Sequence, residues 1–310
     1  MPNQKSPIIK IHATLVEKIN FACHQSAFAV LRELQIENLN EEQALSDLTV
    51  TLAASPGFVK QKTWTVDRLA AGGLLALKDR DLELDGGFLL GLTESMRGSV
   101  TLSVRQGEET LAEHTVPVEL LACNEWGGAG YMPELLAAFC TPNDPTVDRL
   151  LGHASQILRK AGKPDQINGY ESNSREQVWL MASAIYTAIV KMQLGYALPP
   201  ASFESNGQKV RLPNHIESAR VATCLDTTLL FAAALEQAQL NPLVVLTKGH
   251  ALVGLWLEKE DLSSVVVDEA ETLRQRIPLQ ELILIETTYT TQHPAPPFSK
   301  AVEAGNKQVS

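Results

Sequence analysis

Cys224 and His250 are the two residues whose types and spacing could together perform covalent chemistry. Cys224 opens a strongly helical run, and His250 begins an apolar segment that has the pattern of a strand. The first turn of a helix presents unpaired N–H groups and a partial positive charge, and both favour a thiolate over a thiol. A thiolate beside an imidazole is the reacting pair of a cysteine nucleophile site.

The elements around the two residues are expected to bring them together. Residues 225–238 are apolar almost all round, which predicts a buried central helix that ends before Pro242. Residues 243–247 and 250–257 read as two antiparallel strands joined by a tight turn at 248–249. Cys224 and His250 can then meet where the helix packs on the sheet.

A structural interpretation of the cysteines competes with this one, because free cysteine commonly behaves as a small buried hydrophobe. We adopt that interpretation for Cys23, Cys123 and Cys140. For Cys224, the order of cysteine before histidine and their placement on a helix and a strand favour an active site.

The segments 210–213, 223–226 and 249–251 resemble the transglutaminase-like superfamily, a papain-related fold with cysteine on a helix and histidine and aspartate on adjacent strands. The resemblance covers about the second half of the chain. It implies a cysteine protease or acyltransferase with Cys224 as nucleophile, His250 as general base and acid, and a carboxylate that orients the imidazole.

The carboxylate that would orient His250 lies in a segment that departs from the superfamily pattern. The superfamily carries it in an Asp-Pro-Thr-like segment after the histidine strand, and this sequence has no such segment. Its nearest equivalent ends the apolar run 282–285 with Glu286. Asp268, after the apolar run 265–267, is the alternative, although residues 268–271 look like the acidic first turn of an inserted helix.

An oxyanion donor is also required for acyl transfer. The backbone N–H of Cys224 is available at the helix start. Gln177, Trp179 and Tyr186 lie on a preceding helix and could reach the site, although amphipathic packing explains the aromatic residues equally well. Asp226 is interpreted as a first-turn charge rather than a catalytic group.

Composition limits the other possibilities. The chain has 310 residues, of which 45% are hydrophobic and 20% charged, as in a globular protein with room for two domains. Its four cysteines form neither a disulfide framework nor a zinc pattern, so we expect no metal and no cofactor. The N-terminus lacks a signal peptide pattern and no apolar run could cross a bilayer, which predicts a cytoplasmic protein without membrane contact. The net charge of −10 and the lack of a basic stripe argue against direct nucleic acid binding.

The first part of the chain has a different pattern from the second. Short, partly alternating segments there predict an antiparallel, immunoglobulin-like β-sandwich over residues 1–124, followed by an α+β transglutaminase-like domain over 125–310. The expected strands of the sandwich are 8–16, 28–36, 48–53, 82–84, 99–106 and 113–121. The expected helices of the second domain before Cys224 are 132–139, 146–161 and 176–194.

This domain order resembles the N-terminal region of large bacterial helicase-related proteins, in which helicase-type motor domains would follow. No P-loop pattern occurs in these residues, so any motor would lie outside them. Two functions therefore stand as expectations. The first is a cysteine-dependent amide hydrolase or acyltransferase that acts on a protein or peptide through a thioester. The alternative is a non-catalytic protein-interaction module.

Overall fold

The structure, a computed structural model, describes residues 8–309. The chain forms a mixed α/β protein with several antiparallel sheets, and it divides into two compact units, one ending at Glu125 and the other beginning at Trp126. The sequence-based boundary was placed one residue earlier.

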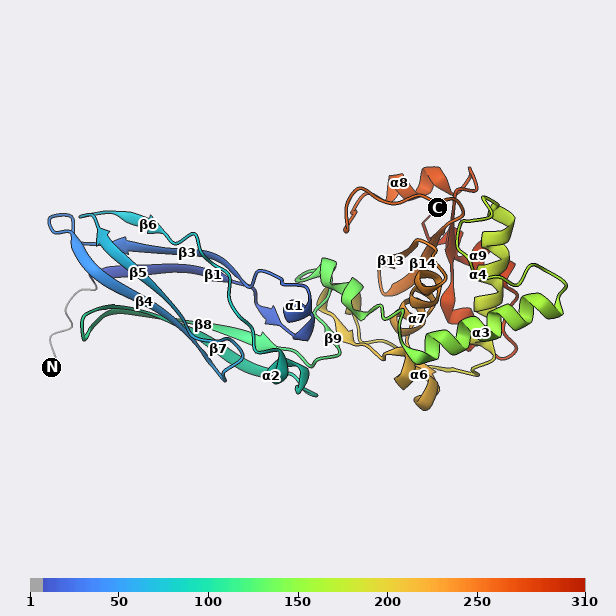
Figure 1. Cartoon of the computed structure of the whole chain (residues 1–310), viewed down its shortest axis with the longest axis horizontal. Helices are drawn as coiled ribbons and strands as arrows, with labels where there is room; N and C mark the ends of the chain where they lie inside the picture. The colour runs from blue at the N-terminus through green and yellow to red at the C-terminus, as the bar shows by residue number, and fades with distance from the viewer. Residues whose placement is uncertain (1–7, 310) are drawn as a thin grey trace. The chain divides into compact units, whose positions relative to one another are not determined.

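The first unit is built mainly from strands, with two short helices (Figure 1). The strands are β1 (Ile9–Leu15), β2 (Lys18–Ile19), β3 (Leu31–Asn38), β4 (Leu45–Ser55), β5 (Lys62–Leu69), β6 (Leu74–Ala76), β7 (Met96–Gln106) and β8 (Glu109–Leu120). The helices are α1 (Phe21–Gln25) and α2 (Gly86–Leu90). One sheet has the order β1–β3–β6 and the other β2–β8–β7–β4–β5, with β2 and β8 parallel and the other pairs antiparallel.

Alternation along these strands places one face of each sheet in a core. Val100, Leu102 and Val104 of β7 are fully buried, as the strict alternation of residues 99–104 predicts. The expected strand at 82–84 is wrong, because Leu84 forms only an isolated bridge with Val59. Four charged residues at 78–81 leave too little apolar surface for a half-buried strand there. The sequence interpretation also missed β5 and β6.

The second unit combines helices with short strands. Its helices are η1 (Pro133–Phe139), α3 (Pro145–Lys160), α4 (Arg175–Val190), α5 (Phe203–Asn206), α6 (Pro213–Ala219), α7 (Cys224–Gln237), α8 (Ala270–Arg276), η2 (Thr287–Thr291) and α9 (Phe298–Lys307). Its strands are β10 (Gly195–Tyr196), β11 (Gln208–Lys209), β12 (Val221–Ala222), β13 (Pro242–Thr247), β14 (His250–Trp256) and β15 (Leu282–Ile285), while β9 (Glu125–Trp126) spans the division between the units.

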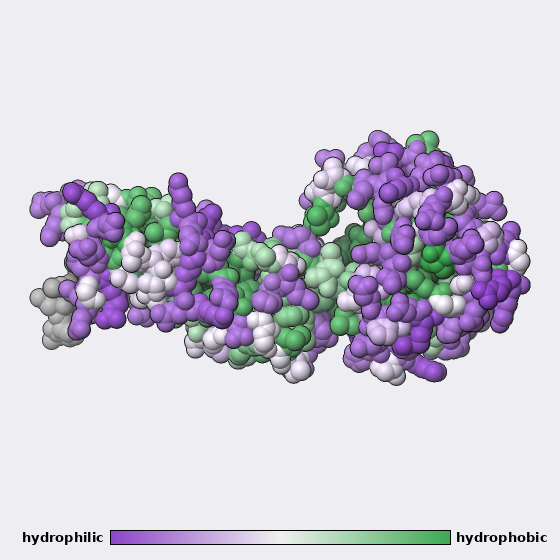
Figure 2. All heavy atoms as spheres, viewed as in Figure 1, coloured by the Kyte–Doolittle hydropathy of each residue, from purple (hydrophilic) through white to green (hydrophobic). Residues whose placement is uncertain are grey.

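Helix α7 is the centre of this unit. Its residues from Cys224 to Leu235 are all buried, and it packs against β13 and β14 on one side and α3 and α4 on another. Strands β13, β14 and β15 form one antiparallel sheet in that order. The apolar side chains of α7 lie inside the unit, and Figure 2 shows hydrophilic residues over most of its visible face.

Most expected elements of the second unit occur within a few residues of their predicted bounds. The expected helix 132–139 is a 3-10 helix of seven residues, longer than most 3-10 runs. Helix α9, which the sequence analysis did not predict, follows Pro297 and buries Phe298, Ala301 and Val302. Within residues 8–309, no helix is both long enough and apolar enough to span a membrane.

Candidate active site

Cys224 is the first residue of α7, and a capping box holds the helix start in place. The Thr223 side chain accepts a hydrogen bond from the Asp226 N–H, while the Asp226 carboxylate accepts one from the Thr223 N–H at 2.9 Å. Arg211 donates to the same carboxylate through its backbone N–H and its guanidinium, at 2.8 and 2.9 Å. Asp226 is therefore occupied in fixing the first turn, in line with its interpretation as a first-turn charge.

His250 is the first residue of β14, directly after the tight turn at 248–249. Gly249 has φ 71, a conformation that glycine adopts without a steric penalty, and His250 pairs with Thr247 across the turn. Strand β14 packs against α7, and the interaction of the His250 and Cys224 side chains shows that the start of the strand lies near the start of the helix. A hydrogen bond joins the side chains of Cys224 and His250.

Glu286 holds the far side of the imidazole. The Nε2 atom of His250 lies 2.7 Å from Oε2 of Glu286, and the Glu286 residue is only 5% exposed. With Nε2 bonded to the carboxylate, Nδ1 is the ring nitrogen left for Cys224. The structure thus brings Cys224, His250 and Glu286 into one chain of contacts.

The segment after β15 fixes the position of Glu286. Its Oε1 atom accepts a hydrogen bond from the backbone N–H of Thr288 at 3.1 Å, and it also accepts one from the Thr288 hydroxyl. The neighbouring Thr287 hydroxyl lies 3.0 and 3.2 Å from the hydroxyls of Thr227 and Thr228 on α7. The helix that carries Cys224 and the segment that carries Glu286 are therefore bonded directly to each other.

The electrostatics of the three residues favour a protonated imidazole. The hydrogen bond with Cys224, followed by that with Glu286, raises the pKa of His250 to about 10. Burial acts to raise the pKa of Glu286, but the hydrogen bonds from His250 and Thr288 outweigh it and leave this pKa below its ordinary value. At neutral pH the site therefore holds an imidazolium between the Glu286 carboxylate and the Cys224 sulfur.

This pair makes the stability of the fold depend on pH in a defined direction. The pKa of His250 is raised from 6.5 to about 10, so its stabilising contribution is complete below about pH 6.5 and is lost as pH rises through about 10. The difference in free energy of unfolding between wild type and His250→Gln should be largest near about pH 6 and should shrink towards about pH 10. Urea unfolding across that range measures it, and a difference that stays constant with pH would contradict the ion pair.

Tyr196 is a member of the site that sequence reasoning missed. It lies on β10, which pairs in parallel with β12 so that Tyr196 is opposite Ala222, two residues before Cys224. Burial raises the pKa of the Tyr196 hydroxyl to about 12, with further contributions from the charge of Cys224 and a hydrogen bond to it. The sequence offered no signal for this contact, because a strand of two residues shows no periodicity.

The other residues considered for the site lie elsewhere. Gln177 donates to the carbonyl of Pro164, the Tyr186 hydroxyl donates to the carbonyl of Pro296, and the Trp179 ring packs edge-on against Phe298. All three side chains are therefore engaged in other contacts, although the Tyr186 hydroxyl also lies close enough to Glu286 for that carboxylate to contribute to its raised pKa. Asp268 is exposed and lies outside the sheet, in the segment before α8, whereas Glu286 bonds to His250.

The remaining cysteines differ from Cys224. None of the four cysteines forms a disulfide bond, and burial together with the nearby Glu236 carboxylate raises the pKa of the Cys140 thiol to about 12. Among residues 8–309 there is no group of three or more His, Cys, Asp or Glu side chains arranged to hold a metal ion. What the structure assembles is a thiol, an imidazole, a carboxylate and a phenol.

In comparisons of the sequence with known proteins, no family model and no curated protein matches the chain.

Proposed function

We propose that the unit beginning at Trp126 is a transglutaminase-like, papain-related domain that acts as a cysteine-dependent amide hydrolase or acyltransferase on a protein or peptide. The observation that carries this proposal is the chain of contacts from Cys224 at the start of α7 through His250 to the buried Glu286. This order of nucleophile, base and orienting carboxylate is the one that cysteine acyl transfer requires.

The residues can divide the reaction between them. The Cys224 sulfur attacks the carbonyl carbon of the amide and forms a tetrahedral intermediate, whose oxygen carries the negative charge. The imidazolium of His250 then gives its proton to the leaving amine, the C–N bond breaks, and a thioester remains on Cys224. Water or a second amine, deprotonated by His250, attacks the thioester and releases the acid or the new amide.

We propose two hydrogen-bond donors for the negatively charged oxygen of the tetrahedral intermediate. Cys224 is at the first position of α7, where the backbone N–H groups have no partner within the helix. The Tyr196 hydroxyl is hydrogen-bonded to Cys224 in the resting site and is partly exposed, at 42% for the residue. When the sulfur becomes bonded to the acyl group, this hydroxyl is free to donate to the oxyanion instead.

The site opens to solvent at its edge rather than at the sulfur. Cys224 is 0% exposed, whereas the His250 side chain is 21% exposed and Tyr196 more so. A substrate carbonyl can therefore reach the sulfur only after a side chain over it moves. Tyr196 is the exposed group in contact with Cys224, so a shift of its ring that keeps the hydroxyl beside the sulfur would open the path.

An activated ester tests the proposal without knowledge of the natural substrate. Incubation with p-nitrophenyl acetate should release a burst of about one p-nitrophenol per protein. Peptide mapping by mass spectrometry should find the acetyl group on Cys224. Acetylation confined to lysines, with no burst, would contradict the enzyme.

Tyr196→Phe should slow the acylation of Cys224 by about 100-fold, the order of effect expected for loss of one oxyanion donor. Alkylation by iodoacetamide forms no oxyanion, so its rate should change by less than about threefold. Stopped-flow measurement of both reactions on the two proteins separates the effects. An equal loss of rate in both reactions would show that the Tyr196 hydroxyl activates the thiol rather than stabilises the oxyanion.

A second candidate function is a non-catalytic protein-interaction module, as implied by the resemblance to the N-terminal region of helicase-related proteins. The complete burial of Cys224 favours it, because an inert core thiol is also buried. We infer that the first unit, with its two sheets and alternating strands, is an immunoglobulin-like sandwich that would serve as scaffold under either function. The two functions differ in whether Cys224 reacts in the folded protein.

A further inference from the structure

Strand β13 is an outer strand of the three-stranded sheet in the second unit (Figure 1). The opposite edge, on the side of β15, is covered by α9. There the Leu284 N–H donates to the Asn306 side chain at 2.9 Å. The Glu286 N–H donates to the Ala301 carbonyl at 3.0 Å. Strand β15 is buried throughout, whereas Val245 alone is buried in β13, so the second unit leaves the β13 edge of its sheet open.

The register of the hairpin shows which backbone groups lie on this open edge. Thr247 and His250 flank the two-residue turn and exchange backbone hydrogen bonds, and every second residue of β13 does the same with β14. The intervening residues Val244 and Leu246 therefore direct their N–H and C=O groups away from β14. Within residues 8–309 these groups have no hydrogen-bond partner. They form a row of backbone donors and acceptors along the strand.

The sequence of β13 does not protect this edge. Edge strands are commonly kept from pairing by an internal lysine or proline, or by a β-bulge. From Leu243 to Thr247 the strand has no charged residue and no proline, and its register with β14 runs without a shift. It therefore keeps the geometry that pairs with another extended chain, whose backbone supplies the matching acceptors and donors.

The open edge leads to the candidate active site. Strand β13 ends at Thr247, which pairs with His250, and the His250 side chain is hydrogen-bonded to Cys224. Residues of an extended chain are spaced about 3.3 Å apart. A chain that pairs with Leu246 and runs parallel to β13 therefore reaches the level of His250 within about two residues.

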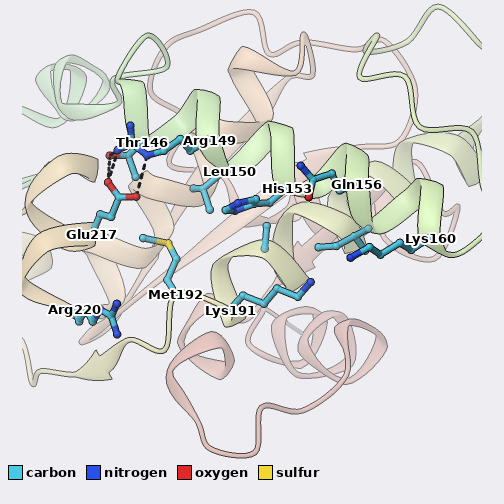
Figure 3. A pocket seen from close by; sticks show the side chains of 12 residues that line it. Thr146, Arg149, Leu150, His153, Gln156, Lys160, Lys191, Met192, Glu217 and Arg220 are labelled. Carbon is cyan, nitrogen blue, oxygen red and sulfur yellow. Dashed lines mark hydrogen bonds and ion pairs between the residues drawn. The ribbon is translucent and has the colours of Figure 1, made fainter.

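The groove along α3 differs from this edge in how its polar groups are arranged (Figure 3). It has a volume of about 450 Å³, and its cations are spread along its length. Arg149 is bonded to Glu217 near the start of α3, whereas Lys160 is the last residue of this helix. Residues 149 and 160 are separated by a rise of about 16 Å along the helix, so these cations meet at no common ligand group. The backbone groups of β13, by contrast, lie in register with one extended chain.

We propose that the open edge of β13 binds an extended segment of the polypeptide substrate as an added parallel strand, which delivers the reacting carbonyl to Cys224. This inference rests on the proposed function, because it assigns the bound segment to the acyl part of the substrate. In a parallel strand the chain runs towards His250, so the reacting carbonyl follows the paired residues. Val244 and Leu246 are apolar and half-buried, which favours β-branched residues opposite them.

Two activated esters with the same reacting group test the edge in the full chain. They are acetylglycine p-nitrophenyl ester and the p-nitrophenyl ester of acetyl-Thr-Val-Thr-Val-Gly. The pentapeptide ester should acylate Cys224 at least about 20-fold faster, the order expected for about two added hydrogen bonds. Release of p-nitrophenol gives the rates, and peptide mapping locates the acyl group.

Two N-methylated isomers of the pentapeptide ester supply a matched control. One isomer carries methyl groups on the first and third amide nitrogens, and the other carries them on the second and fourth. An edge strand uses only every second N–H of the chain that pairs with it. One isomer should therefore react as slowly as the acetylglycine ester, and the other should stay within about threefold of the unmethylated ester. Equal rates of the two isomers would overturn the added strand.

Leu246→Pro tests the same contact from the side of the protein. It removes an outward N–H at an edge position where a strand tolerates proline, whereas Leu246→Val changes the side chain and keeps the N–H. Leu246→Pro should slow acylation by the pentapeptide ester about fivefold, and Leu246→Val less than about twofold. Both variants should leave the acetylglycine ester within about twofold of wild type.

The outcomes separate this inference from the proposed function. Acylation of Cys224 by the acetylglycine ester, with the pentapeptide ester no faster, would overturn the added strand and leave the enzyme standing. Failure of both esters to acylate Cys224 would overturn both. A chain that sediments as a dimer, and that Leu246→Pro converts to a monomer with unchanged ester rates, would assign the edge to a second copy of the chain instead of the substrate.

Discussion

Replacing His250 with glutamine is expected to slow the acylation of Cys224 by p-nitrophenyl acetate by about 10³-fold at about pH 7, within the range for loss of a general base. The structure gives the reason, because His250 is bonded to Cys224 on one side and to Glu286 on the other. Glutamine keeps hydrogen-bonding atoms at the position but cannot take up the thiol proton. The measured quantity is the rate of the p-nitrophenol burst.

His215→Gln is the matched control for this experiment. His215 is exposed on α6 and takes no part in the contacts around Cys224, so the same exchange there should leave the burst rate within about twofold. A His250→Gln protein that is folded by circular dichroism yet acylates at the wild-type rate would show that Cys224 reacts without the imidazole.

The second large effect on acylation is expected when Glu286 is replaced. Glu286→Gln should slow acylation by about 100-fold, because the neutral amide no longer stabilises the imidazolium of His250. It should also lower the free energy of unfolding by about 2 kcal/mol near neutral pH, since one charge of a mostly buried, hydrogen-bonded pair is lost. Burst kinetics and urea unfolding on the same protein give both quantities.

Asp268→Asn is the control for Glu286→Gln, because it removes a carboxylate that the sequence offered for the same role. Asp268 is exposed in the segment before α8, so this exchange should change stability by less than about 0.5 kcal/mol and leave acylation unaltered. Equal effects of the two substitutions, or a larger effect at Asp268, would show that Glu286 does not orient the imidazole.

The parts of the second unit that follow strong periodicity could be predicted from the sequence. The apolar run after Cys224 predicts the buried helix α7, and the turn at 248–249 predicts the hairpin of β13 and β14. The contact between His250 and Glu286 could be predicted only from the resemblance to the transglutaminase-like superfamily. The acidic run 268–271 favours Glu286 over Asp268, but no local pattern shows that Glu286 is buried against His250, because that contact arises from how β15 pairs with β14.

Features that depend on contacts between distant segments could not be predicted in this way. The position of Tyr196 results from the pairing of two strands of two residues each, β10 and β12. Helix α9 was missed because glycine, asparagine and lysine at its end look like a polar tail, while its buried face is short.

The reactivity of Cys224 in the folded protein decides whether Cys224, His250 and Glu286 form an active site. Iodoacetamide is added at about pH 6, below the range in which an ordinary thiol with a pKa of about 8.5 reacts, and alkylation of each cysteine is followed by peptide mapping. Cys140, whose pKa is raised to about 12, serves as the internal reference. Cys224 should be alkylated at least about 100-fold faster than Cys140, and His250→Gln should remove this advantage. Alkylation of Cys224 that is as slow as that of Cys140 until urea unfolds the chain would contradict an activated thiol at this site.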